Sequence, residues 1–100
     1  MAELREAIDI LDARLVAMLA LRQAYVERAA VLKTERAAVH DAARIEAVVK
    51  KVVAEGKREG LSPDIAEKVW RALIAASIEH EYAAFDGKEG HNRPLTRGHE

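Results

Sequence analysis

Apolar and small residues recur along the first third of the chain in steps that alternate between four and three, as they do on one face of a helix. They are Leu4, Ile8, Leu11, Leu15, Met18, Tyr25, Ala29 and Leu32. No Pro or Gly interrupts this segment, and the Ala, Leu, Glu and Arg residues that fill it favour a helix. The pattern predicts one long helix over about residues 3–33, packed along its whole length.

Arg22 takes the one position of this stripe where the pattern calls for an apolar residue. A buried guanidinium is costly unless it is paired, so Arg22 either pairs with a carboxylate, extends to water, or binds an anion. Lys33 shares the face of Arg22 about 16 Å further along the helix, and two such cations suit a small dianion. Arg5 lies about 25 Å before Arg22, so it serves such a site only in a second copy of the chain.

A second helix is predicted over about residues 42–57, with Asp41 as its N-cap and with Gly56 and Gly60 ending it. Its apolar face consists of Ile45, Val48, Val49, Val52 and Val53. The segment Ser-Pro-Asp at 62–64 starts a third helix, which is predicted to end near Phe85. Together these helices form one domain over residues 1–86, followed by a flexible tail over residues 87–100.

Polar side chains interrupt the inward faces of the second and third helices as well. Ser77 and Glu81 lie one turn apart and face the core, where a hydroxyl and a carboxylate need partners. These polar residues can also be explained without a functional site. Ser77 would then bond to its own helix, Glu81 would pair with a cation such as Arg22, and Arg44 would be solvated. Taken together, three cations, a hydroxyl and a carboxylate face inward on three helices: Arg22, Lys33, Arg44, Ser77 and Glu81.

The composition and net charge limit the classes of fold and partner that are expected. Half of the residues are hydrophobic but only 4% are aromatic, which suits closely packed helices. A net charge of −1 gives no reason to expect nucleic acid or a membrane as partner. There is no cysteine, no membrane-spanning run and no apolar signal core after Met1, so a cytoplasmic protein is expected. His91 and His99 are too isolated to predict a metal site, and no cofactor is expected.

The order and spacing of the polar residues resemble the all-helical chorismate mutases, a class that includes isochorismate pyruvate lyases. The segment 4–12 (LREAIDILD) is similar to the first-helix signature of this family, and Arg22, Lys33 and Arg44 follow at its intervals. Ser77 and Glu81 match its third-helix pair, in which the second residue is Gln or Glu. The resemblance covers about residues 3–85 and implies an all-α fold, three helices per chain with a long first helix, in an intertwined homodimer.

The resemblance also implies two equivalent sites and a reaction, the rearrangement of chorismate to prephenate in aromatic amino-acid biosynthesis. Arg5 from the partner chain and Arg22 would bind the two carboxylates, while Lys33 and a protonated Glu81 would donate to the ether oxygen of the breaking bond. Arg44 and Ser77 would support these contacts. The implied substrate-binding residues are Arg5, Arg22, Lys33, Asp41, Arg44, Ile45, Ser77 and Glu81, with Lys33 and Glu81 catalytic and with no metal.

Position 45 departs from the family pattern. Mutases often carry Glu directly after the second-helix Arg, where it bonds a substrate hydroxyl, but this chain has Ile45, and Glu46 lies about 100° further round the helix. The lyase relatives also tend to be apolar there. Chorismate mutase is the predicted function. The alternatives are an isochorismate pyruvate lyase making salicylate and pyruvate, and a non-catalytic helical dimerisation module, in which Arg22 and Lys33 pair with carboxylates and leave no pocket.

Overall fold

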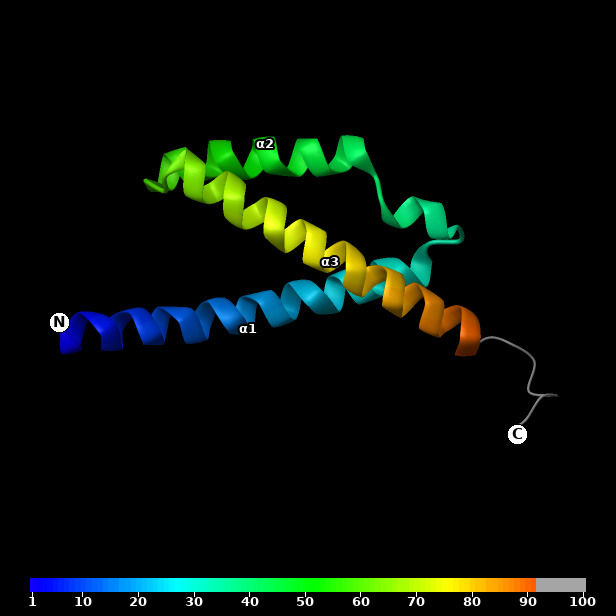
Figure 1. Cartoon of the computed structure of the whole chain (residues 1–100), viewed down its shortest axis with the longest axis horizontal. Coiled ribbons are helices and arrows are strands. Elements are labelled where there is room, and N and C mark those ends of the chain that lie inside the picture. Colours follow the sequence, from blue (N-terminus) through cyan, green and yellow to red (C-terminus); the bar gives the residue numbers. More distant parts are fainter. Residues whose placement is uncertain (92–100) are drawn as a thin grey trace.

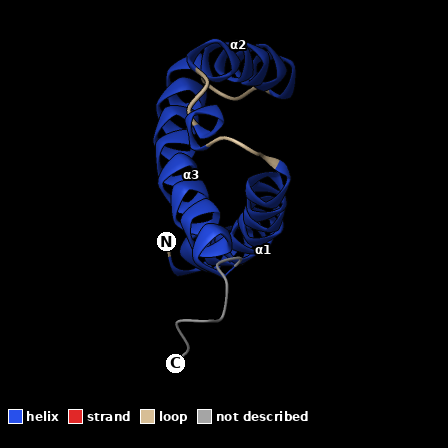
Figure 2. Ribbon diagram, turned by 90° about the vertical axis from the view of Figure 1, so that its right-hand side faces the viewer, coloured by secondary structure: helices blue, strands red, loops and turns tan. Residues whose placement is uncertain are grey.

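The computed structural model describes residues 1–91, which form three α-helices and one short 3-10 helix (Figure 1). The elements are α1 (Ala2–Leu32), η1 (Arg36–Val39), α2 (Ala42–Glu59) and α3 (Pro63–His91). Helix α3 packs against α1, α2 and η1. Viewed along the long axis, the chain has a C-shaped cross-section with α3 between α2 and α1 (Figure 2). The described part of the chain contains no strand, so the predicted all-helical fold is confirmed.

Most of α1 has no neighbour within the chain. Residues 2–21 are all exposed, and the apolar stripe that predicted the helix is exposed with them, at 62% for Leu4, 56% for Leu11 and 59% for Leu15. This part of α1 extends alone beyond its crossing with α3 (Figure 1). The position of the helix was therefore predicted correctly, but packing along its whole length is not found within a single chain.

The core that the chain builds alone is small. The buried apolar residues among those described are Ala30, Val39, Val49, Ala66, Ile74 and Phe85, and no large side chain among them is fully buried. The radius of gyration is 17.8 Å, whereas a compact chain of 100 residues has about 13 Å. None of the described helices is long and apolar enough to cross a membrane.

Two predicted helix caps are present. The Asp41 carboxylate accepts a hydrogen bond from the Arg44 backbone amide at 3.0 Å, and α2 begins at Ala42 as predicted. At the start of α3 the Ser62 hydroxyl accepts from the Ile65 amide at 3.4 Å. These caps place the first turns of both helices, and Asp41 thereby fixes where Arg44 stands.

The two glycines predicted to end α2 have different roles. Gly60 ends it in the left-handed conformation, with φ 84°, and the amides of Gly60 and Leu61 bond back to Lys57 and Gly56 at 3.3 and 2.8 Å. Gly56 is corrected to a buried position inside the helix. A Cβ built on Gly56 would lie 3.5 Å from the Cβ of Ala66, which is an ordinary van der Waals distance, so α3 leaves room for a methyl group there.

Alanine at these two positions is expected to shift stability in opposite directions. Gly56→Ala should raise the free energy of unfolding by about 0.5–1 kcal/mol, because the helix interior favours Ala and the added methyl makes ordinary contacts. Gly60→Ala should lower it by about 1–2 kcal/mol, because a residue with a Cβ is strained at φ 84°. Urea unfolding measures both changes, and equal destabilisation by the two variants would contradict the assignment.

The end of α3 requires a second correction. The helix runs to His91 rather than to Phe85, so residues 87–91 belong to it and not to a flexible tail. Sequence alone favoured the earlier end because Gly87 and Gly90 disfavour a helix. Asp86 and Lys88 make contacts with distant residues that offset this cost. The remainder of the predicted tail, with His99, lies outside the described residues.

Candidate functional site

The three helices and η1 line an open cavity of about 470 Å³. Its walls contain every predicted site residue except Arg5, namely Arg22, Lys33, Asp41, Arg44, Ile45, Ser77 and Glu81. The remaining walls are mostly apolar and include Tyr25, Val26, Ala29, Ala38, Val39, Val48, Ile74 and Ile78. Residues separated by more than half of the chain thus meet in a cationic cavity with apolar walls.

Arg22 is held in place by a hydroxyl. Its Nη1 donates to the Ser77 Oγ at 2.8 Å, which links α1 to α3. The pairing of Arg22 with Glu81, which the sequence left open, is therefore not the one observed. Because a hydroxyl carries no charge, this bond orients the guanidinium on the cavity wall without neutralising it.

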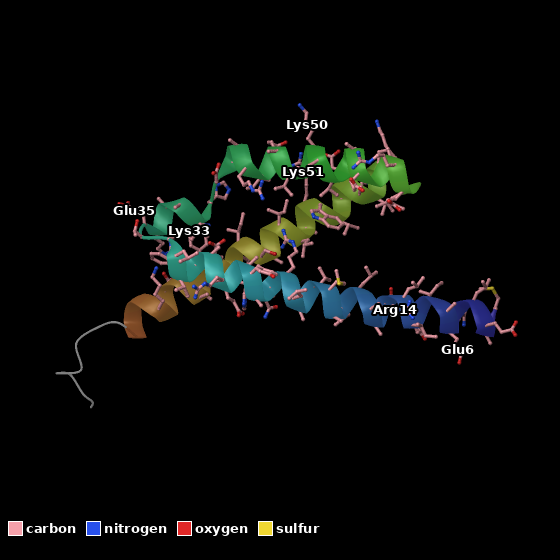
Figure 3. The ribbon with its side chains drawn as sticks, turned by 180° about the vertical axis from the view of Figure 1, so that it is seen from behind. Glu6, Arg14, Lys33, Glu35, Lys50 and Lys51 are labelled. Atoms are coloured by element: carbon pink, nitrogen blue, oxygen red, sulfur yellow. The ribbon has the colours of Figure 1, made fainter. Side chains whose placement is uncertain are left out.

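Lys33 and Glu81 form an ion pair across the cavity. The Lys33 Nζ lies 2.5 Å from the Glu81 Oε2, and the two side chains are 30% and 9% exposed. Lys33 is the first residue after α1, where the chain turns into an extended conformation, and its amide donates to the Ala29 carbonyl at 3.0 Å. Figure 3 shows Lys33 at this end of α1. Among the described residues, Glu81 is the one charged residue that is buried. The expectation that it pairs with a cation is confirmed.

The wall formed by α2 presents Arg44 and Ile45 to the cavity, while Glu46 is held elsewhere. Both carboxylate oxygens of Glu46 accept from the guanidinium of Arg71 at 2.9 Å, and Arg71 also donates to Glu67. The hydrogen bonds from Arg71 lower the pKa of Glu46. Glu46 is therefore committed to a bond with α3 and leaves an apolar side chain, that of Ile45, on the cavity wall.

Arg5 lies far from this cavity. It belongs to the part of α1 that extends alone, about 25 Å from Arg22 along a straight helix. Figure 3 shows the neighbouring Glu6 and Arg14 on this segment, at the opposite end of α1 from Lys33. Arg5 cannot contact a ligand that Arg22 holds in the same chain.

A second cavity, of about 360 Å³, lies on the other side of the Arg22–Ser77 bond. Leu19, Leu73 and His80 contribute to its walls. The His80 Nε2 lies 2.6 Å from the Glu27 Oε2, and this hydrogen bond lowers the pKa of Glu27. No sequence pattern marked His80 or Glu27, because these two side chains meet only where α3 crosses α1.

Two wall residues that sequence analysis also missed, Ala38 and Val39, come from η1. No sequence pattern marked them, since a four-residue 3-10 helix is too short to show a period. Among the described residues, no group of three or more His, Cys, Asp or Glu side chains is placed to hold a metal ion.

The fold and the cavity define an all-helical protein whose three helices surround a cationic site. The chain matches the family described as chorismate mutase type II over residues 4–82 and belongs to that family. This confirms the family that the residue spacing resembled. A comparison with curated proteins found no match.

Proposed function

We propose that the protein is a chorismate mutase, which converts chorismate to prephenate. The observation that carries this proposal is the meeting of Arg22, Lys33 and Arg44 around one cavity. Chorismate bears two carboxylates, and guanidinium groups bind carboxylates through paired hydrogen bonds. The apolar walls suit its ring, and a bound ring would displace water from them, which strengthens these charge interactions.

The reaction demands little chemistry from the protein. The ether C–O bond of chorismate breaks while a C–C bond forms in the same molecule, so no proton, electron or nucleophile is exchanged with the enzyme. The site must hold the folded conformer and stabilise the negative charge that grows on the ether oxygen. Arg22 holds a carboxylate, and the Lys33 ammonium donates to the ether oxygen. Glu81 joins Lys33 as a second donor when its carboxyl is protonated.

The complete enzyme is a homodimer with composite sites. The exposed apolar stripe of α1, including Leu4 and Leu11, is the kind of surface that a second chain covers. Pairing of two α1 helices would bury both stripes and would bring Arg5 of one chain toward the cavity of the other. Arg5 would then bind the second carboxylate. The large radius of gyration and the small core support a chain that needs a partner.

The position of Ile45 favours a second candidate, an isochorismate pyruvate lyase. With Ile45 on the wall and Glu46 bonded to Arg71, the α2 wall offers no carboxylate from positions 45 and 46 to a substrate hydroxyl. The non-catalytic module is less well supported. It required carboxylate partners for both Arg22 and Lys33 and a closed interior, whereas Arg22 bonds Ser77 and the cavity is open.

Parallel assays on chorismate and isochorismate distinguish the two enzymes. We expect prephenate from chorismate to form with a higher kcat/KM than salicylate and pyruvate from isochorismate. Ile45→Glu, which supplies a hydroxyl acceptor, should raise kcat/KM for chorismate about tenfold. Glu46→Gln is the matched control, since it removes a carboxylate that faces away from the cavity, and it should leave kcat/KM unchanged. If the wild type has a higher kcat/KM for isochorismate, forming salicylate and pyruvate, than for chorismate, the protein is a lyase and not a mutase.

A further inference from the structure

The C-terminal end of α1 is capped by a side chain from another helix. α1 has no basic residue in its own last turn. Instead, the Lys88 Nζ from α3 donates to the carbonyl oxygens of Ala30 and Val31, at 3.0 Å each, and to that of Lys33. An ammonium has three donors, and all three are used here. The cation also complements the negative end of the α1 dipole.

Aromatic and apolar side chains pack around this cap. The Lys88 Nζ lies 4.6 Å from the centre of the Phe85 ring. Phe85 is 4% exposed and forms a buried cluster with Ala30 of α1 and Val39 of η1. The same turn of α3 thus holds the end of α1 through its charge and through its apolar surface.

A second contact fixes the start of η1. The guanidinium of Arg36 donates to both carboxylate oxygens of Asp86, at 2.9 and 3.2 Å, and lies 4.3 Å from the centre of the Tyr82 ring. The hydrogen bond from Arg36 also lowers the pKa of Asp86. The segment 33–39, which leads from α1 through η1, is therefore attached to α3 at Lys33 and again at Arg36.

Three groups of Lys33 each have a partner. Its amide bonds the Ala29 carbonyl, its own carbonyl accepts from Lys88, and its ammonium bonds Glu81. Glu81, Phe85 and Lys88 follow one another on a single face of α3, at steps of four and three residues. One face of α3 therefore determines both where the Lys33 backbone stands and what its ammonium contacts.

We propose that Lys88 is a positioning residue that holds the Lys33 backbone so that the Lys33 ammonium points into the cavity. This inference rests on the proposed function, in which Lys33 donates to the ether oxygen. Asp86 and Lys88 lie beyond the family match, which ends at residue 82. The last turns of α3 do not line the cavity and act on it through Lys33.

Kinetics on chorismate test the proposal. Lys88→Met keeps the aliphatic stem but removes the donors, so kcat should fall about tenfold because the ammonium of Lys33 loses its position. KM should change less than about twofold, since Arg22 is untouched. Lys88→Arg should retain most of the activity. Lys68→Met is the matched control, because Lys68 lies on the same helix in an exposed ion pair with Asp64, and it should behave as the wild type.

A double-mutant cycle separates positioning from general stabilisation. If Lys88 acts through Lys33, Lys88→Met should cost almost nothing in a Lys33→Ala background. The same tenfold loss in both backgrounds, or a loss confined to KM, would overturn the proposal.

Hydrogen–deuterium exchange supplies a readout that needs no substrate. In Lys88→Met, the amides of residues 33–39 should exchange about tenfold faster, while those of α2 should not change. Unchanged exchange in this segment would overturn the inference whatever the enzyme does. A wild type that turns over neither chorismate nor isochorismate would overturn the proposed function alone, and selective exchange in segment 33–39 would still support the anchoring of Lys33 by Lys88.

Discussion

Mixing Arg5→Ala subunits with Arg22→Ala subunits should restore about a quarter of the wild-type activity, although each variant alone should lose about 10²–10³-fold in kcat/KM. Random pairing makes half of the dimers mixed, and one of the two sites in a mixed dimer receives an intact Arg5 and an intact Arg22. The expectation follows from the distance of about 25 Å between these residues on one helix. Steady-state assays of the variants before and after exchange measure it.

Arg14→Ala is the matched control for this experiment. Arg14 is an exposed arginine on the same segment of α1, and its removal should leave most of the activity. Subunit exchange is followed independently by mass spectrometry of differently labelled chains. No recovery in a mixture that has demonstrably exchanged would contradict the composite site, and full activity of Arg5→Ala alone would remove Arg5 from it.

Substitutions of Glu81 should separate charge from hydrogen bonding. Glu81→Ala should lower kcat/KM for chorismate by about 10²–10³-fold, because it removes a donor and leaves Lys33 without its partner. Glu81→Gln should retain substantial activity, since an amide donates at every pH. Activity that is kept in Glu81→Gln but lost in Glu81→Ala would identify hydrogen bonding, rather than charge, as the contribution of this position.

Steady-state assays of kcat/KM for chorismate with the wild type, Glu81→Gln and Glu81→Ala measure these effects. Glu79→Gln, at an exposed position of the same helix, is the matched control and should follow the wild type. A Glu81→Ala variant that is nearly as active as the wild type would mean that Glu81 takes no part in the reaction.

Local patterns predicted the three helices well because helix formation is largely encoded locally. Periodicity located α1, and the Asp41 cap placed the start of α2 at Ala42. The end of α3 was not predictable in this way. It depends on the bonds of Asp86 to Arg36 and of Lys88 to Ala30, which join residues 50 and 58 positions apart.

The sequence predicted which residues form the site better than it predicted which of them bond to one another. Spacing and resemblance selected residues that the fold brings to one cavity. Which group bonds which depends on the rotation of α3 against α1, and this rotation placed Ser77 opposite Arg22 and Glu81 opposite Lys33. The role of Gly56 was misjudged for the same reason, because its burial beside Ala66 belongs to the tertiary packing of α2 and α3.

The exposed stripe of α1 has a consequence for how this protein responds to its own abundance. If a second chain completes the core, association and folding become one equilibrium, and the folded fraction depends on the total concentration of chains. Each tenfold dilution then removes about 1.4 kcal/mol from the stability of the dimer relative to separated chains. The amount of enzyme in a cell would thereby determine how many chains are folded as well as how fast the substrate is consumed.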